Sequence, residues 1–370
     1  MSGVIPTVDG IPVVKLSASE QPTFADTRPL ETARDAIGTA PSRLRLRISA
    51  AWWRSLQYVG MTLHYLAPPR PPNPSFSKSI PSTISNVKGR FTLQFYTPQG
   101  YEEAARTGTR FPAVVNFHGG GFTLGSATDD ARFTRFVLEQ CNAVVVSVDY
   151  RLSPENPFPV AVQDGADALL YLIRFAADLH IDPLKLAVSG FSAGANLSLT
   201  SPLCLADHIK SVKASGLTIP DHRIRAVATW YPTTDYTISR AVKRATSVRP
   251  DQTLPDTLTS LFDASYLDPP SLRLAHPYIS PSKATDEQLV AAIPETVIFY
   301  TCEWDMLLKE GEELAQRLGR APINKDVRYK MIPGVPHAWD KSPDPTKPAP
   351  AAAELYRECC EILREVFARE

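Results

Sequence analysis

Six short apolar runs of strand length restrict the possible folds more than any other feature of the chain. They are continuous rather than alternating with polar residues, which is typical of strands that are covered on both faces of a parallel sheet. Because parallel neighbours need long crossover connections, helices are expected between them. The runs are Ala113–Phe117, Ala143–Val148, Lys185–Ser189, Ile224–Trp230, Thr296–Thr301 and Val327–Ile332.

The segment Val160–Leu179, between the second and third runs, has the periodicity of a crossover helix. Its apolar residues recur at spacings of four, three and four (Val162, Ala166, Leu169 and Ile173), which places them on one face of a helix. The β-α-β order predicts an α/β fold with a mostly parallel, doubly wound sheet. Phe91–Tyr96 alternates and predicts a more exposed first strand, and Glu354–Phe367 predicts a closing helix.

Two regions fall outside this alternation and are predicted to form a cap over one end of the sheet. Residues 1–85 form the first, and residues 86–370 the core, into which a second cap segment is inserted at about 235–275. The first region contains the aromatic-rich helical stretch Leu44–Leu66 and then a proline cluster at 68–74, which is expected to be a rigid connector.

The stretch Leu44–Leu66 also has an alternative interpretation as a helix lying on a membrane surface. Arg54, Gln57 and His64 interrupt its apolar residues. These interruptions favour the apolar face of a lid over the membrane interpretation.

The composition argues against several classes of function. The 370-residue chain carries 39 basic and 39 acidic side chains, so no net field attracts nucleic acid or acidic lipid. Its five cysteines are scattered and are expected to be reduced. The N-terminus lacks a signal-peptide pattern and no window has 18 uninterrupted apolar residues. We therefore expect a cytoplasmic protein without stable membrane insertion, and its oligomeric state stays open.

Gly190-Phe191-Ser192-Ala193-Gly194 fits the G-x-S-x-G pattern and directly follows the predicted strand Lys185–Ser189. A sharp strand-to-helix turn of this kind leaves the serine hydroxyl exposed above the sheet, and its flanking residues must have almost no side chain. The pattern alone is short enough to arise by chance, so its weight depends on partners elsewhere in the chain. Ser192 is the candidate nucleophile.

The partners of Ser192 occur in the chain order that such a site requires. His118-Gly119-Gly120-Gly121-Phe122 follows the strand Ala113–Phe117, and consecutive glycines let backbone amides approach a substrate carbonyl. The predicted oxyanion donors are the amides of Gly120, Gly121 and Ala193.

His337 is the candidate base, because it lies in a loop bracketed by proline and glycine after the last predicted strand. Asp305, just beyond the strand Thr296–Thr301, is the candidate orienting acid, and Glu303 in the same turn is a rival. The residues Arg151 and Glu155 are expected to form ion pairs that brace the loop they share.

Together these motifs resemble the hormone-sensitive-lipase-like group of α/β-hydrolases, which includes microbial esterases and arylacetamide deacetylases. The resemblance runs from about Phe111 to Trp339 and also includes Asp149–Glu155 and Tyr231-Pro232. It implies an α/β-hydrolase fold with a helical cap, and the roles just given for Ser192, Asp305 and His337.

Two departures from the family pattern concern the substrate. Phe191 stands where the family most often has Asp or Thr, and Ala338-Trp339 stands where Gly-Phe is usual. Phe122, Phe191 and Trp339 are therefore predicted to line the substrate pocket.

The function predicted from the sequence is hydrolysis of a small-molecule carboxylic ester or lactone through an acyl-enzyme, without cofactor or metal. One alternative is a biosynthetic enzyme on the same fold that catalyses acyl transfer, lactonisation, elimination or cyclisation. A second is a small-molecule receptor that has lost catalysis. The absence of zinc-ligand spacing and of phosphate-binding glycine patterns argues against metal and nucleotide sites.

Overall fold

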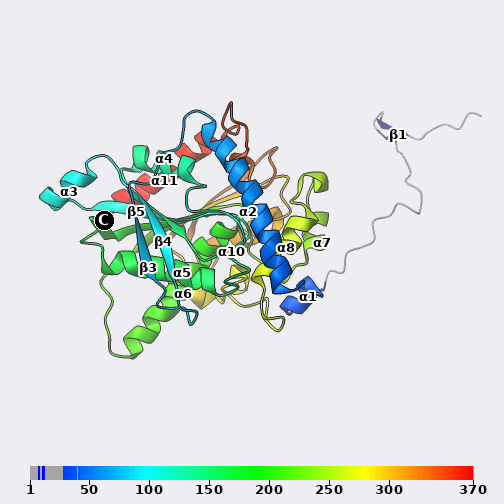
Figure 1. Ribbon diagram of the computed structural model, residues 1–370, viewed down its shortest axis with the longest axis horizontal. Coiled ribbons are helices and arrows are strands. Elements are labelled where there is room, and N and C mark those ends of the chain that lie inside the picture. Colours follow the sequence, from blue (N-terminus) through cyan, green and yellow to red (C-terminus); the bar gives the residue numbers. More distant parts are fainter. Residues whose placement is uncertain (1–6, 9–10, 13–27, 40, 370) are drawn as a thin grey trace, which may run out of the picture.

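A computed structural model describes residues 7–8, 11–12, 28–39 and 41–369. An eight-stranded sheet forms its centre (Figure 1), with the strand order β10-β9-β8-β7-β5-β6-β4-β3. The six strands β5 to β10 are parallel to one another, whereas β4 is antiparallel to both of its neighbours, β6 and the edge strand β3. They are β3 (Phe76–Pro81), β4 (Arg90–Tyr96), β5 (Phe111–Phe117), β6 (Val144–Asp149), β7 (Ile181–Phe191), β8 (Ile224–Trp230), β9 (Thr296–Cys302) and β10 (Asp326–Ile332). A separate pair consists of β1 (Thr7–Val8) and β2 (Ile11–Pro12).

Helices connect most of the strands and cover the sheet. They are α1 (Ala33–Ile37), α2 (Arg43–Leu66), α3 (Tyr101–Thr107), α4 (Ala131–Cys141), α5 (Val160–Arg174), α6 (Ala193–Ala214), α7 (Arg240–Ala245), α8 (Asp256–Tyr266), α9 (Asp286–Ala292), α10 (Leu308–Gly319) and α11 (Ala352–Ala368), with short 3₁₀ turns at Pro250–Gln252, Pro281–Lys283 and Trp339–Lys341. Among the described residues, no helix combines the length and apolar character needed to cross a membrane.

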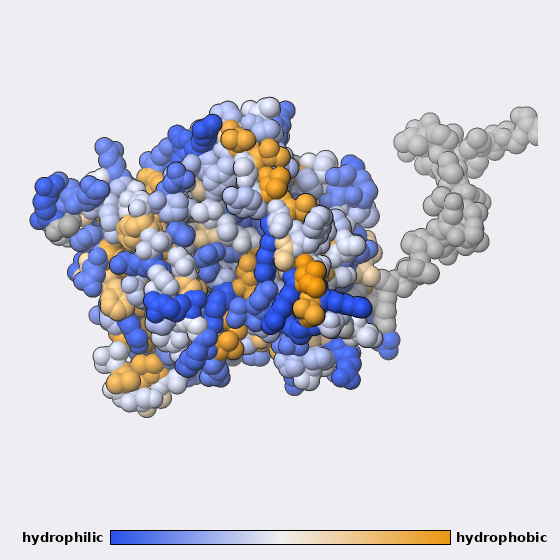
Figure 2. Space-filling view, in the orientation of Figure 1, coloured by the Kyte–Doolittle hydropathy of each residue, from blue (hydrophilic) through white to orange (hydrophobic). Residues whose placement is uncertain are grey.

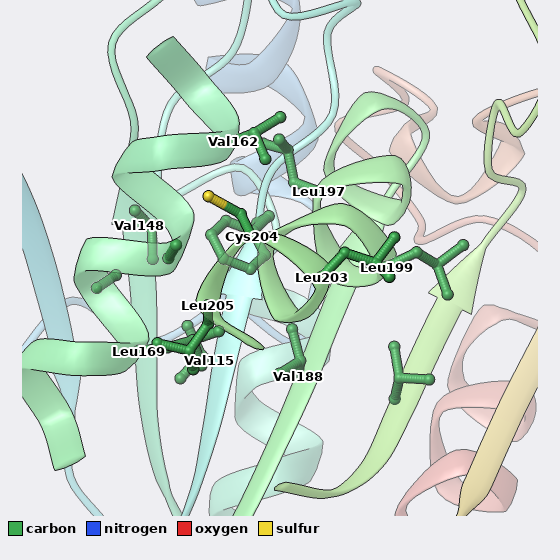
Figure 3. Packing of buried hydrophobic residues seen from close by; sticks show 14 of the residues in the cluster. Val115, Val148, Val162, Leu169, Val188, Leu197, Leu199, Leu203, Cys204 and Leu205 are labelled. Carbon is green, nitrogen blue, oxygen red and sulfur yellow. The ribbon is translucent and has the colours of Figure 1, made fainter. Parts of the chain in front are cut away.

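The sheet is buried on both faces. In β5, Ala113, Val115 and Phe117 belong to the cluster under α5 and α6, whereas Val114 belongs to the cluster under α4 and α11. This alternation is the two-residue period of a strand. Figure 3 shows the first cluster, where side chains of α5 and α6 meet those of β5, β6 and β7. The continuous apolar runs in the sequence follow directly from this two-sided burial.

The doubly wound α/β fold predicted from the sequence is confirmed, and each of the seven predicted core strands is present. One strand, β3, lies inside the segment predicted as cap. It pairs with β4 along its whole length, so the boundary placed at residue 85 falls after the first strand of the sheet. Its sequence Phe-Ser-Lys-Ser-Ile-Pro buries only Ile80, which is why no apolar pattern predicts it.

The helices of the two segments outside the β-α-β alternation lie at one end of the molecule (Figure 1). Helix α2 packs against α8, and α1 also contacts α8 (Figure 1). Residues 28–66 and 235–275 are therefore neighbours in space, although some 170 residues separate them in the chain. We call α1, α2, α7 and α8 the cap helices.

Polar side chains attach α2 to the core. Arg54 donates hydrogen bonds to the carbonyls of Thr123 and Ser153 and pairs with Glu155 at 2.9 Å. Gln57 accepts from the amide of Gly125 at 2.7 Å and donates to Asp129 at 2.9 Å. The middle of α2 is therefore held by loops that follow strands β5 and β6.

The C-terminal end of α2 is held by Arg132 of α4. Its guanidinium donates to the carbonyls of His64 and Ala67, and its Nε donates to Nε2 of the His64 ring at 3.1 Å. Because Nε2 accepts, the ring proton lies on Nδ1, which donates to the carbonyl of Ser342 at 3.0 Å. Burial lowers the pKa of His64 to about 4, and Lys341 and Arg132 act in the same direction. His64 is thus a neutral, doubly bonded anchor.

Candidate active site

Ser192 lies at the sharp turn between β7 and α6. Its backbone has φ 55° and ψ −115°, a conformation that costs a non-glycine residue energy and that surrounding contacts must hold. The Ser192 amide donates to the carbonyl of Trp230 at 2.8 Å. A Cβ at Gly190 would lie 2.1 Å from the carbonyl oxygen of Gly194, and one at Gly194 would lie 2.0 Å from that of Phe117. Only glycine fits at both positions.

The structure brings Ser192, His337 and Asp305 together in one hydrogen-bonded chain. The distance from Ser192 Oγ to His337 Nε2 is 2.7 Å, and from His337 Nδ1 to Asp305 Oδ2 it is 2.6 Å. An ionised carboxylate only accepts, so Nδ1 carries the ring proton and Nε2 is free to accept from the serine hydroxyl. Each of the three residues follows the carboxyl end of a strand: Ser192 follows β7, Asp305 follows β9 and His337 follows β10. These carboxyl ends meet at one edge of the sheet.

The two carboxylates of the turn after β9 have different partners. Asp305 is buried, faces His337, and accepts the Leu307 amide at 3.0 Å through its second oxygen. Glu303 accepts the amide of Gly334 at 2.7 Å. Glu303 therefore secures the loop that leads to His337, and the structure places Asp305, not Glu303, against the imidazole.

The glycine loop after β5 lies beside Ser192. A Cβ at Gly119 would be 3.5 Å from that of Ser192. Gly120 has φ 111°, and a Cβ there would lie 2.3 Å from the carbonyl oxygen of Leu124. Within the described part of the chain, the amides of Gly120, Gly121 and Ala193 donate to no other protein group. Three predicted oxyanion donors are thus free for a ligand.

A cavity of about 280 Å³ opens above Ser192. Its wall is mostly apolar and comes from both the core and the cap helices. The apolar side chains are Met61, Leu124, Tyr231, Leu254, Leu258 and Phe262, and polar ones are Gln57, Asp129, Asp130 and Lys341. Apart from Tyr231, which lies in the Tyr231-Pro232 motif, no motif marked these residues in the sequence, because their place at the cavity depends on how the cap packs.

Of the three residues predicted to line the substrate pocket, one lies at the cavity. Phe191 borders it, but its ring stacks on Trp230 with centroids 5.4 Å apart and belongs to the core under α4 and α11. Phe122 and Trp339 do not line it. The ring of Phe122 stacks on Tyr266, and the indole of Trp339 donates to the carbonyl of Pro350. Both are core side chains, so that part of the prediction is corrected.

A buried ion cluster forms one side of the cavity. The Lys341 ammonium lies 2.8 Å from Asp130 and 3.0 Å from Asp340, and 3.8 Å from the centre of the Phe191 ring. Burial alone would lower the pKa of Lys341, but the two carboxylates raise it well above its ordinary value. Burial raises the pKa of the neighbouring Asp129. No pattern in the sequence indicates this cluster.

The ion pairs predicted for the loop that contains Arg151 and Glu155 are present. Arg151 pairs with the buried Asp164, and Glu155 pairs with Arg54 of α2. Neither lies among the residues of the cavity. These side chains hold the loop and the cap together.

Residues 114–341 match a protein family described as having the alpha/beta hydrolase fold. The chain belongs to this α/β-hydrolase family. The match covers the strands from β5 to β10 and contains Ser192, Asp305 and His337. The family expected from the sequence is therefore confirmed.

Curated relatives and solved structures agree with the family. This α/β-hydrolase is 32% identical to carboxylic ester hydrolase LipN of Mycobacterium tuberculosis over 67% of the chain and 61% of that relative, and 31% identical to an arylesterase of Saccharolobus solfataricus over 55% and 61%. The match thus spans about three-fifths of the length of these relatives. An esterase of Pyrobaculum calidifontis has a similar structure, with a TM-score of 0.67 and 27% identity over 87% of this chain and 97% of that one.

Proposed function

We propose that the protein is a serine hydrolase that cleaves carboxylic esters through an acyl-enzyme. The observation that carries the proposal is the chain of hydrogen bonds from Ser192 through His337 to Asp305, at the base of an apolar cavity. A serine hydroxyl is a weak nucleophile by itself, and an adjacent imidazole held by a carboxylate makes it reactive.

The geometry supports a two-step reaction. Ser192 Oγ attacks the ester carbonyl as its proton passes to His337 Nε2, and Asp305 stabilises the imidazolium that forms. The imidazolium returns the proton to the leaving alcohol oxygen as the C–O bond breaks, which leaves the acyl group on Ser192. Water then attacks the acyl-enzyme, with His337 again as base, and releases the carboxylic acid.

The amides of Gly120, Gly121 and Ala193 are the proposed oxyanion hole. They would stabilise the negative oxygen of each tetrahedral intermediate, which is where preorganised donors contribute most to the rate. Gly121 also contacts the cap closely, because a Cβ there would lie 2.2 Å from the ring of Phe262. The cap therefore limits the space next to the proposed oxyanion hole.

The cavity favours an uncharged, hydrophobic ester. Its wall is mostly apolar, and the polar part of the wall holds the carboxyl groups of Asp129 and Asp130, with Lys341 already paired. A carboxylate elsewhere on the substrate would meet no unpaired cation among the described residues of this wall. The names of the relatives, an arylesterase and a carboxylic ester hydrolase, agree with an ester as substrate.

Replacement of Ser192 by Ala tests the proposal. We expect kcat on a p-nitrophenyl ester to fall by about 10⁵ to 10⁶ with the fold intact. Ser189→Ala is the matched control: Ser189 is buried three residues earlier, and its hydroxyl has no hydrogen-bond partner among the described residues. This control should keep its activity and react with a serine-directed phosphonate, whereas Ser192→Ala should not.

A panel of acyl chain lengths, an aryl acetate and a lactone would then locate the preferred ester. Retention of most activity by Ser192→Ala would overturn the mechanism. If the wild type ignored every ester and lactone in the panel yet reacted with the phosphonate, a transfer or cyclisation reaction at the same serine would replace the proposal.

A further inference from the structure

The outward face of α2 is an exposed apolar stripe. Eight of its large apolar side chains are exposed, and all of them except Tyr58 lie on one face. The first two of these seven, Leu44 and Ile48, are 68% and 63% exposed. With 3.6 residues per turn, these side chains fall within an arc of about 120° that runs the length of the helix. The seven residues, which we call the α2 stripe, are Leu44, Ile48, Trp52, Leu56, Val59, Leu63 and Leu66. Figure 2 shows apolar side chains along the diagonal course of α2.

Four polar residues of α2 point the opposite way, toward the core. Arg43 donates to the carbonyls of Ala264 and Ser265, while Arg54, Gln57 and His64 bind the core as described above. The three residues that interrupt the stretch in the sequence are thus the ones that attach it. They do not lie on the outward face, where Arg45, Ser55 and Thr62 are the polar residues within the arc of the stripe. The three interruptions therefore do not argue against a surface-binding helix in the fold.

The charge of α2 has one sign. The helix contains no aspartate or glutamate, and Arg45 and Arg47 are exposed near its N-terminal end. A straight helix of 24 residues is about 36 Å long. An apolar stripe of that length that includes a tryptophan and is flanked by arginine is the pattern of helices that lie in the plane of a lipid surface. Anionic headgroups would meet Arg45 and Arg47.

We propose that the α2 stripe docks the protein reversibly on the surface of an anionic lipid bilayer. Docking needs no helix formation, because α2 is already folded and attached to the core, so no backbone ordering opposes it. The helix lies along the surface and does not span the bilayer. The apolar side chains supply most of the affinity, and Arg45 and Arg47 add a part that salt screens.

Helix α2 also borders the way to Ser192, through side chains that are not part of the stripe. A second cavity of about 440 Å³ is lined by Tyr58, Met61, Thr62 and Tyr65 of α2. It shares Gln57, Met61 and Asp129 with the cavity above Ser192. If the proposed function holds, an ester dissolved in the lipid reaches the nucleophile along the side of α2 that lines these two cavities. The docking itself does not depend on that function.

Co-sedimentation with lipid vesicles tests the docking in the full-length Ser192→Ala protein, which keeps binding separate from hydrolysis. We expect binding to vesicles of phosphatidylcholine with phosphatidylglycerol, and weaker binding to phosphatidylcholine alone or in high salt. Trp52 should enter a less polar environment, so tryptophan fluorescence should shift to the blue. Trp52→Phe should remove most of that shift and keep most of the binding.

A matched pair of variants locates the surface. Leu44→Ser/Ile48→Ser should weaken vesicle binding by roughly tenfold or more. The control Leu217→Ser/Val248→Ser changes two apolar residues, each 64% exposed, that lie outside α2, and it should bind like the parent. Circular dichroism of each variant checks that the fold is kept.

Three results would overturn the docking proposal. They are no binding of the parent to anionic vesicles at low salt, equal loss in the control variant, and a dimer in solution that Leu44→Ser/Ile48→Ser dissociates. The last would assign the stripe to a second copy of the chain. None of them concerns hydrolysis, which the Ser192→Ala comparison decides by itself.

Discussion

Phe191 and Ser192 are neighbours in the chain but serve different parts of the molecule. The Ser192 hydroxyl meets His337, whereas the Phe191 ring packs among Phe133, Trp230 and Tyr356. The strand period explains this, since Ala187 and Phe191, four residues apart on β7, belong to the same core cluster. The bulk that the sequence places next to the nucleophile therefore fills the core.

Replacement of Phe191 by Ala should thus act on stability. We expect the free energy of unfolding to fall by about 3–5 kcal/mol, because a buried aromatic ring leaves a cavity in a packed cluster. Urea unfolding measures the loss. Phe175→Ala, at an exposed phenylalanine, is the control and should cost far less. An unchanged stability with an altered acyl preference would show that Phe191 selects the substrate after all.

The two acidic residues after β9 should also differ in their effects. Asp305→Asn should lower kcat by about 10⁴, because an amide cannot hold the imidazole in the required tautomer as a carboxylate does. Glu303→Gln should keep most activity, since the amide oxygen can still accept from Gly334. Steady-state kinetics of the two variants decide between them, and a larger loss in Glu303→Gln would reverse the assignment.

Residues that carry the chemistry could be proposed from the sequence because their motifs also determine the backbone around them. Gly190 and Gly194 are required by close contacts within the turn itself. Lys341 and Met61 reach the cavity only through contacts between distant segments. No local pattern records such contacts.

At the scale of elements, the buried strands were predictable and the edge strand was not. The sheet interior needs continuous apolar runs, whereas β3 pairs on one side only and carries Ser77, Lys78 and Ser79. The bounds of helix α2 were predicted to within one residue, but the face that it turns toward the core was not predicted. Arg54, Gln57 and His64 only interrupt an apolar stretch in the sequence, whereas in the structure they attach the helix to the core.

The attachment of α2 through His64 makes stability depend on pH. The folded-state pKa of about 4 lies below the ordinary value of 6.5, so the unfolded chain binds the proton more readily. Above pH 6.5 the neutral His64 contributes fully to the free energy of unfolding. As the pH falls from 6.5 toward 4 this contribution is lost, and the total loss is about 3 kcal/mol.

Chemical unfolding at several pH values measures this effect. His64→Gln should be less stable at pH 7 and should show a smaller decrease in stability between pH 6.5 and 4 than the wild type. His222→Gln, at a half-buried histidine outside α2, is the control and should keep the wild-type slope. An unchanged slope in His64→Gln would contradict the role of His64.

At the scale of the whole molecule, the cap and the core are joined by a few charged side chains. Arg54 bridges the loops after β5 and β6 and pairs with Glu155. Arg54→Met should lower the free energy needed to release α2 from the core by about 2 kcal/mol, because the carbonyls of Thr123 and Ser153 lose their charged hydrogen-bond donor.

Hydrogen exchange of the α2 amides measures this release. The amides of α2 should exchange faster in Arg54→Met, with those of β7 and β8 unchanged. Arg45→Met removes an exposed arginine from the same helix and is the control. Equal acceleration in β7 would mean that the cap and the core unfold as one unit.

The way in which α2 is attached has a consequence for protein engineering. Its anchors mostly bind backbone carbonyls, at Thr123, Ser153, His64 and Ala67, and every amino acid supplies a carbonyl. The outer positions of the helix take no part in these bonds. They can therefore be substituted together, with polar residues to limit aggregation or with a single cysteine for immobilisation on a support. Helix α2 would still cover the catalytic end of the sheet.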